Sequence, residues 1–268
     1  MIPGECGGGI RYTEHGDPHG DPVVLLAGFK APARSWRFQI PVLVAAGFRV
    51  FAVDLPGHGG TALPAGTDME VRGRDLRTFL TTAVTGRAHL VGASMGGNTL
   101  WSYLDRFGTG RVGRIVIVDQ TPKMLNTPDW PHGFYGYTEA NADTYFRDGI
   151  PETGHGVPLW RRGAAAVRLL VAMRGTDPAL TEPEKELLAD HAGRDWRAVV
   201  AGADVPTLFV AGARSEFWPH EHAAASAALN PNASAAVVER AGHGVNMERP
   251  RAFGHGLVAY LRRGSAAG

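Results

Sequence analysis

The stretch from Val91 to Gly97 constrains the fold of this chain more than any other. It reads Val-Gly-Ala-Ser-Met-Gly-Gly, follows a short apolar run and precedes a helical pattern that begins at Asn98. Glycines on both sides of Ser94 permit a tight strand-to-helix turn with strained backbone angles. Such a turn holds a serine hydroxyl above the sheet edge, beside an N–H at a helix N-terminus. The pattern predicts a nucleophilic Ser94, and the alternative is a glycine-rich turn with an incidental serine.

Predicted strands and helices alternate along most of the chain. Strands are expected at 8–15, 23–27, 48–54, directly before Ser94, and at 114–119, 205–212 and 235–239, and helices at 34–46, 68–84, after Ser94, and 251–262. This alternation is typical of a parallel sheet covered by helices on both faces. The predicted fold class is therefore α/β, with a mostly parallel central sheet built from residues 1–120 and 197–268.

Residues 121–196 break the alternation, because they contain helical pieces and no convincing strand. Six aromatics crowd into positions 130–146, namely Trp130, Phe134, Tyr135, Tyr137, Tyr145 and Phe146. An insertion after a strand's carboxyl end lies above the ligand-binding edge of the sheet. We therefore expect a helical lid, inserted after the sixth strand, over an apolar substrate pocket. The expected pocket residues are Trp36, Trp130, Phe134, Tyr135, Tyr137 and Phe217. The alternative is that the lid aromatics only anchor the lid to the core.

Composition argues against several classes of protein. The net charge is +1 and no basic run suggests a nucleic-acid partner. No apolar stretch approaches the roughly 18 residues of a membrane span. The N-terminus lacks the pattern of a secretory signal, and the single Cys6 excludes an internal disulfide. We therefore expect a cytoplasmic protein, monomeric or homodimeric, with a small-molecule partner.

A serine hydroxyl needs a base, and histidine is the usual one. His243 follows the last predicted strand, so it should lie at the same sheet edge as Ser94. His58 is expected to pack within its loop rather than act as a base. His220 and His222 form a His-x-His pair without a matching third ligand, so we expect a solvated helix start and no metal site.

These motifs together resemble those of the α/β-hydrolase superfamily over nearly the full chain. The matching segments are Gly-Ala-Ser-Met-Gly-Gly at 92–97, Asp-Leu-Pro-Gly-His-Gly at 54–59, Leu-Leu-Ala-Gly-Phe at 25–29, and Gly242-His243. The resemblance implies a lidded serine esterase or lactonase. It also implies an oxyanion hole formed by the backbone N–H groups of Phe29 and Met95. The family often has histidine where this chain has Ala27, but a backbone donor does not need that side chain.

The position where the family usually carries its catalytic acid is Ser215 in this chain. Two carboxylates can replace it, namely Asp119 and the neighbouring Glu216. Asp119 is favoured, because it follows the apolar run 115–118 and should emerge at the shared edge. An acid after that earlier strand is a known variant in the superfamily. The alternative for Asp119 is a cap of the following turn.

The expected reaction is cleavage of a carboxylic ester or lactone through an acyl-enzyme. The substrate should be medium-sized and apolar or aromatic, and no metal or organic cofactor is required. One alternative is a cofactor-free perhydrolase or haloperoxidase with the same triad. Another is a carbon–carbon bond hydrolase, in which Arg161, Arg162 or Arg168 binds a substrate carboxylate. A non-catalytic ligand-binding protein on the same fold is the alternative of a different class.

Overall fold

A computed structural model describes residues 1–59, 61 and 63–263 of the chain. Within these residues, eight strands form one sheet in the order β1-β2-β4-β3-β5-β6-β7-β8. All neighbours from β4 to β8 pair in parallel, whereas β1–β2 and β2–β4 pair antiparallel. The strands are β1 (Ile2–Cys6), β2 (Ile10–His15), β3 (Pro22–Leu26), β4 (Arg49–Asp54), β5 (Ala88–Ala93), β6 (Val112–Val118), β7 (Thr207–Gly212) and β8 (Ala233–Val238). The α/β fold class is confirmed.

Two local predictions differ from the structure. Strand β1 was not predicted, because its sequence Ile-Pro-Gly-Glu-Cys contains proline and glycine, which are depleted in strands. Its edge position accommodates the proline. The helix predicted at 34–46 is two pieces, a 3-10 turn η2 (Ala33–Trp36) and the helix α1 (Ile40–Ala45). Pro41 lies in the first turn of α1, where its missing N–H is tolerated and where it prevents continuation of a preceding helix.

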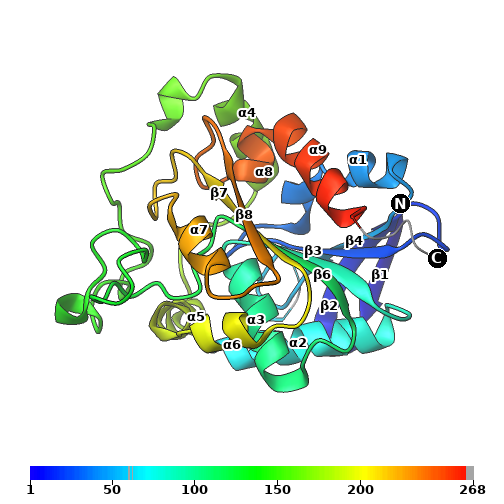
Figure 1. Cartoon of the computed structure of the whole chain (residues 1–268), viewed down its shortest axis with the longest axis horizontal. Coiled ribbons are helices and arrows are strands. Elements are labelled where there is room, and N and C mark those ends of the chain that lie inside the picture. The colour runs from blue at the N-terminus through cyan, green and yellow to red at the C-terminus, as the bar shows by residue number, and fades with distance from the viewer. Residues whose placement is uncertain (60, 62, 264–268) are drawn as a thin grey trace.

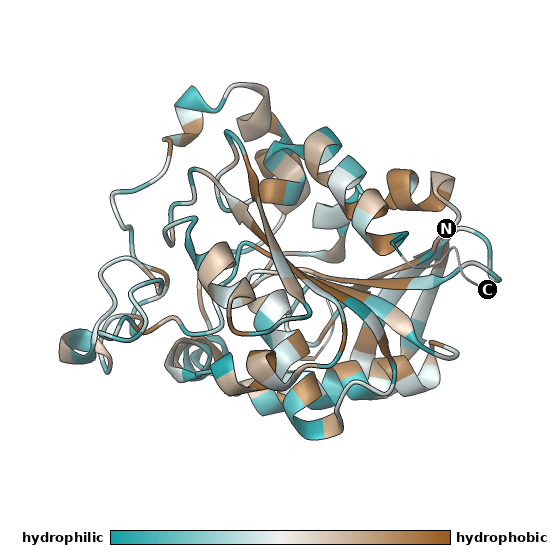
Figure 2. Ribbon diagram, viewed as in Figure 1, coloured by the Kyte–Doolittle hydropathy of each residue, from teal (hydrophilic) through white to brown (hydrophobic). Residues whose placement is uncertain are grey.

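Helices cover both faces of the sheet. Figure 1 shows α1 and α9 (Pro250–Leu261) above it, and α2 (Met69–Thr82), α3 (Met95–Phe107) and α6 (Arg197–Gly202) below it. The remaining α-helices are α4 (Ala164–Met173), α5 (Glu182–Gly193), α7 (His222–Ala227) and α8 (Val245–Glu248). Two apolar cores lie between these layers, one on each face, and the central strands appear brown in Figure 2. No helix among the described residues is both long and apolar enough to cross a bilayer.

Residues 121–196 lie outside the sheet and include α4, α5 and the 3-10 turns η3 (Glu139–Asn141) and η4 (Leu159–Arg161). Figure 1 shows much of this green segment as extended loops that reach away from the sheet. Its two ends meet, because Lys123 forms an isolated bridge with Asp195. The Lys123 Nζ lies 3.7 Å from the Asp195 carboxylate. That this segment acts as a lid remains a prediction.

A buried polar cluster joins α2, α3 and α5 below the sheet. The Arg72 guanidinium is 2% exposed and donates to the Thr99 hydroxyl at 3.1 Å. Burial, together with the charge of Arg72, lowers the pKa of His58 and of His191 to about 3. Both histidines are therefore neutral in the folded protein near pH 7.

These two histidines predict that acid destabilises the fold. An unfolded histidine has a pKa of about 6.5, so the unfolded chain binds more protons between about pH 6.5 and pH 3. The free energy of unfolding should fall as pH falls through this window. Urea denaturation at pH 7.5, 6, 5 and 4.5 measures it. His191→Gln should flatten the dependence, while the exposed His255→Gln should not. An unchanged slope in His191→Gln would contradict this account.

Candidate active site

Ser94 lies at the turn between β5 and α3. Its backbone angles are φ 51° and ψ −131°, outside the regions that L-residues normally adopt. The turn is tight on both sides. A Cβ atom on Gly92 would lie 2.5 Å from backbone atoms of Gly96, and a Cβ on Gly96 would lie 2.6 Å from the Leu26 carbonyl oxygen. Met95, the first residue of α3, therefore carries its N–H directly beside the serine.

The tight turn at Ser94 predicts that one added methyl group lowers the stability of the protein. In Gly92→Ala the added Cβ meets rigid backbone, so the turn must open or strain, at a cost of about 1–3 kcal/mol of stability. Urea denaturation measures this loss. Gly110→Ala is the matched control, since nothing lies within 4 Å of a Cβ there. If Gly92→Ala is as stable as Gly110→Ala, the turn is not as tightly constrained as its contacts indicate.

Asp119 follows β6 and is fully buried, with a left-handed φ of 47°. The pairing of Ala93 with Val118 brings it beside the serine turn. Its Oδ1 accepts the backbone N–H of Gly212 at 2.7 Å. Its Oδ2 accepts three donors, namely the hydroxyl of Ser215 at 2.7 Å, the indole N–H of Trp218 at 3.1 Å and Nδ1–H of His243 at 2.8 Å. A carboxylate with four donors is held as an anion of fixed orientation.

His222 is a fifth group near this carboxylate. It is 1% exposed and its Nε2 lies 3.7 Å from Oδ1 of Asp119. The expectation of a solvated helix start is therefore wrong for His222, although His220 is exposed. Burial alone raises the pKa of Asp119, but the interactions with His222 and His243 outweigh it and hold that pKa far below the usual range. Asp119 is therefore held as an anion near neutral pH.

His243 follows β8 and lies in the loop before α8. Its side chain is 19% exposed, and its ring packs 4.4 Å from the ring of Phe217 and 5.4 Å from that of Trp218. With Nδ1–H donated to Asp119, Nε2 is left free to accept a proton. Within the described part of the chain the ring makes no direct hydrogen bond to Ser94 Oγ. Such contacts are often long in unliganded enzymes and tighten when substrate binds.

Glu216, considered above as the alternative acid of the triad, lies beside the same loop. Its Oε2 accepts the backbone N–H of His243 at 2.9 Å, and its Oε1 pairs with Arg162 at 3.1 Å. It therefore contacts the main chain of the histidine, whereas Asp119 contacts the imidazole. Ser215, at the position where the family usually has its acid, instead donates its hydroxyl to Asp119.

The segment after β3 lies next to the serine. Leu26 pairs with Gly92, so the two strand ends lie side by side. A Cβ on Gly28 would lie 2.9 Å from Cβ and 3.4 Å from Oγ of Ser94. Gly28 thus lies close to the serine side chain, and the N–H expected to donate to an oxyanion belongs to the next residue, Phe29.

Two residues of the 54–59 motif hold this segment. His58 Nε2 accepts the backbone N–H of Lys30 at 3.1 Å, and Oδ1 of Asp54 accepts the N–H of Ala33 at 2.6 Å. Lys30 itself has a left-handed φ of 56°. His58 is buried and neutral, so its position agrees with loop packing rather than with a role as base.

The six predicted pocket aromatics divide into two groups. Four are packed in the interior with exposures of 0 to 4%, namely Trp36, Trp130, Phe134 and Tyr137. Their burial favours the anchoring alternative, and Trp36 belongs to the core below α9, where it packs on Phe253. Tyr135 and Phe217 are half-buried. Phe217 remains a candidate substrate contact, because it lies against His243.

Comparison with known proteins agrees with this fold. The profile of the alpha/beta hydrolase family matches residues 23–254. A non-heme chloroperoxidase from Streptomyces lividans is 29% identical, over 96% of this chain and 97% of the relative. The crystal structure of a bromoperoxidase from Bacillus anthracis superposes with a TM-score of 0.76 at 25% identity, covering 94% of this chain and 95% of the other. The enol-lactonase from Burkholderia xenovorans LB400 has a TM-score of 0.73 at 22% identity, covering 94% and 96%. The chain belongs to the alpha/beta hydrolase family.

Proposed function

We propose that this protein is a serine hydrolase that cleaves a carboxylic ester or lactone through an acyl-enzyme. Ser94 is the nucleophile, His243 the base and Asp119 the acid of its triad. The observation that carries the proposal is the 2.8 Å hydrogen bond from His243 Nδ1 to the buried Asp119 carboxylate. This bond fixes the tautomer in which Nε2 can take a proton from a serine.

The reaction follows from this arrangement. Nε2 of His243 takes the Ser94 proton as Oγ attacks the substrate carbonyl, and the buried carboxylate of Asp119 stabilises the imidazolium. The N–H groups of Phe29 and Met95 donate to the oxyanion of the tetrahedral intermediate. His243 then protonates the leaving alcohol. Water attacks the acyl-serine with the same histidine as base, which releases the acid and restores Ser94.

Fewer contacts support the proposed substrate class than support the proposed triad. Phe217 packs on His243 and gives the site an aromatic wall, which favours an apolar or aromatic acyl or alcohol group of medium size. The similarity to an enol-lactonase at 22% identity supports the fold, and lactones are retained as substrates on chemical grounds. A screen of p-nitrophenyl esters with short and aromatic acyl groups, beside a panel of lactones, tests this class.

A second candidate reaction has support from the relatives. A non-heme chloroperoxidase and a bromoperoxidase are similar to this chain over almost its full length. In a perhydrolase the same acyl-serine is attacked by hydrogen peroxide instead of water, and a peracid leaves. Measuring peracid formation from acetate and hydrogen peroxide, against ester hydrolysis by the same preparation, separates the two reactions.

A fluorophosphonate probe tests the serine chemistry itself. An activated serine forms a phosphonyl adduct, and intact-mass and peptide analysis should locate it on Ser94. Labelling should be lost in His243→Ala, since without the base the hydroxyl is inert. A folded wild-type protein that is not labelled would favour a ligand-binding protein on the same fold and would end the hydrolase proposal.

A further inference from the structure

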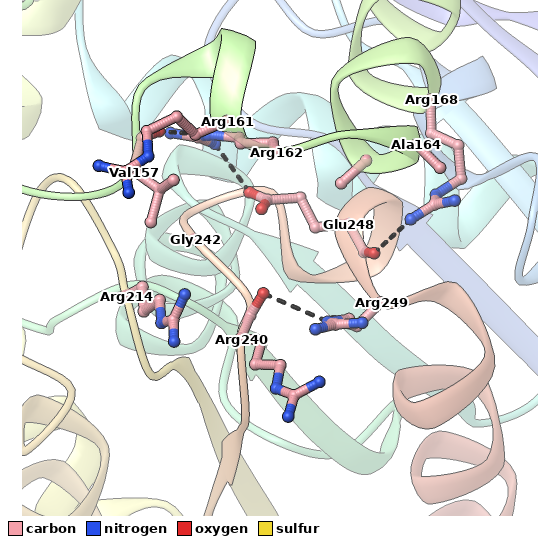
Figure 3. A pocket seen from close by; sticks show the side chains of 11 residues that line it. Val157, Arg161, Arg162, Ala164, Arg168, Arg214, Arg240, Gly242, Glu248 and Arg249 are labelled. Atoms are coloured by element: carbon pink, nitrogen blue, oxygen red, sulfur yellow. Dashed lines mark hydrogen bonds and ion pairs between the residues drawn. The ribbon is translucent and has the colours of Figure 1, made fainter.

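A cavity of about 290 Å³ lies next to the His243 loop, because Gly242 and Glu248 are among the residues that line it. Figure 3 shows arginines reaching it from separate parts of the chain. Among the described residues, six arginines line the cavity, with one carboxylate, that of Glu248. They are Arg161, Arg162, Arg168, Arg214, Arg240 and Arg249, which we call the arginine pocket. Ser94, Asp119 and His243 do not line it, so the pocket is distinct from the candidate active site.

Two arginines of the pocket, Arg162 and Arg168, are less exposed than Arg214 and Arg240 and are bonded to protein groups. Arg162 is bonded to Glu248 at 3.0 Å and to Glu216 at 3.1 Å. Arg168 donates to the carbonyl oxygens of Met247 and Glu248 at 2.9 and 2.7 Å. The expectation that Arg162 or Arg168 binds a substrate carboxylate in the active site is therefore not supported, because the structure commits both groups to protein partners.

Arg214 and Arg240 differ from these. They follow β7 and β8 and are exposed to solvent, and in the described residues neither guanidinium has an ion pair or hydrogen bond to a protein group. Arg240 also has a left-handed φ of 58°, a costly conformation for a side chain of this size. Figure 3 shows Arg214, Arg240 and Arg249 grouped along one side of the cavity. Arg249 uses only its Nε, which donates to the Arg240 carbonyl at 3.2 Å.

This concentration of charge needs an explanation, because the whole chain carries a formal net charge of only +1. Guanidinium groups remain protonated at any ordinary pH, so an anion that enters the pocket meets a permanent positive charge. An oxyanion that bridges two or three guanidiniums accepts charge-assisted hydrogen bonds from each, often two per arginine.

We infer that the arginine pocket binds a phosphate group, free or as a phosphate monoester, on Arg214, Arg240 and Arg249. Phosphate suits the pocket better than a carboxylate. Its three or four oxygens can accept from several guanidiniums that approach from different directions, whereas a carboxylate offers two oxygens in one plane. A divalent charge also matches Arg214 and Arg240, the two arginines of this set without protein partners, better than a single charge does.

Calorimetric titration at pH 7.5 and constant ionic strength tests the inference, with inorganic phosphate and glycerol 3-phosphate as the probes. We expect saturable binding with a Kd of about 1 mM or below. The double variant Arg214→Gln, Arg240→Gln should bind at least about tenfold more weakly, since it loses the charge-assisted bonds. Arg251→Gln is the matched control, because this exposed arginine lies near the pocket but does not line it. It removes one charge and should bind normally.

The titrations with the different probes and variants give distinct answers. Tighter binding of glycerol 3-phosphate than of inorganic phosphate identifies a monoester ligand, and the reverse identifies the free ion. Succinate bound as tightly as phosphate would overturn the phosphate assignment. An absence of saturable binding below about 10 mM, or equal weakening in Arg251→Gln, would overturn the site itself. Ser94→Ala should bind phosphate like the wild type, so this test is independent of the proposed hydrolase reaction.

Discussion

Asp119→Asn is expected to lower kcat on a p-nitrophenyl ester by about four orders of magnitude. The neutral amide of asparagine cannot stabilise the imidazolium as a carboxylate does. Its NH2 group would also face groups that donate hydrogen bonds to the carboxylate, including the Ser215 hydroxyl and the Trp218 indole N–H. The imidazole would then lose the tautomer that leaves Nε2 unprotonated. Initial rates at saturating substrate measure the effect, and circular dichroism verifies that the variant is folded.

Glu216→Gln is the matched control for this prediction. The amide retains an oxygen that can accept the His243 N–H, and it loses only the charge that pairs with Arg162. A partly exposed ion pair of this kind contributes about 1 kcal/mol or less, so the rate should stay within about tenfold of the wild type. A larger loss in Glu216→Gln than in Asp119→Asn would show that the acid has been assigned to the wrong residue.

Ser94→Ala is expected to lower kcat by about six orders of magnitude. The members of a catalytic triad act as a unit, so removal of the nucleophile alone costs about as much as removal of the whole set. Residual rates come from the oxyanion donors and binding. The variant should fold normally, because its backbone turn depends on the glycines around it. Ester hydrolysis that persists within tenfold of the wild type would exclude the acyl-serine mechanism.

The sequence predicted the ends of the parallel strands well, and with them the residues at the sheet edge. Apolar runs such as 23–27 and 115–118 are too short for helices and are bounded by proline, glycine or charged residues. Both the strand and the point where it reaches the sheet edge can therefore be predicted. Asp119 could be preferred to Glu216 on this basis, and the structure brings its carboxylate to the His243 imidazole.

The partners of Asp119 could not be predicted, because they depend on long-range packing. Trp218 and His222 are about a hundred residues away, and only the folded loop after β7 brings them to the carboxylate. A His-x-His pattern at a helix start carries no signal that one histidine is buried. The same limitation applies to the aromatics of 130–146, since composition reveals their number but not which of them face the core.

The most direct test of the account is a crystal structure of the protein after reaction with a fluorophosphonate. We expect a phosphorus–oxygen bond to Ser94 Oγ, with the phosphonyl oxygen about 2.7–3.1 Å from the N–H groups of Phe29 and Met95. His243 Nδ1 should still be bonded to Asp119. Phosphonylation of another residue, or an imidazole that pairs with Glu216 in the adduct, would contradict the account.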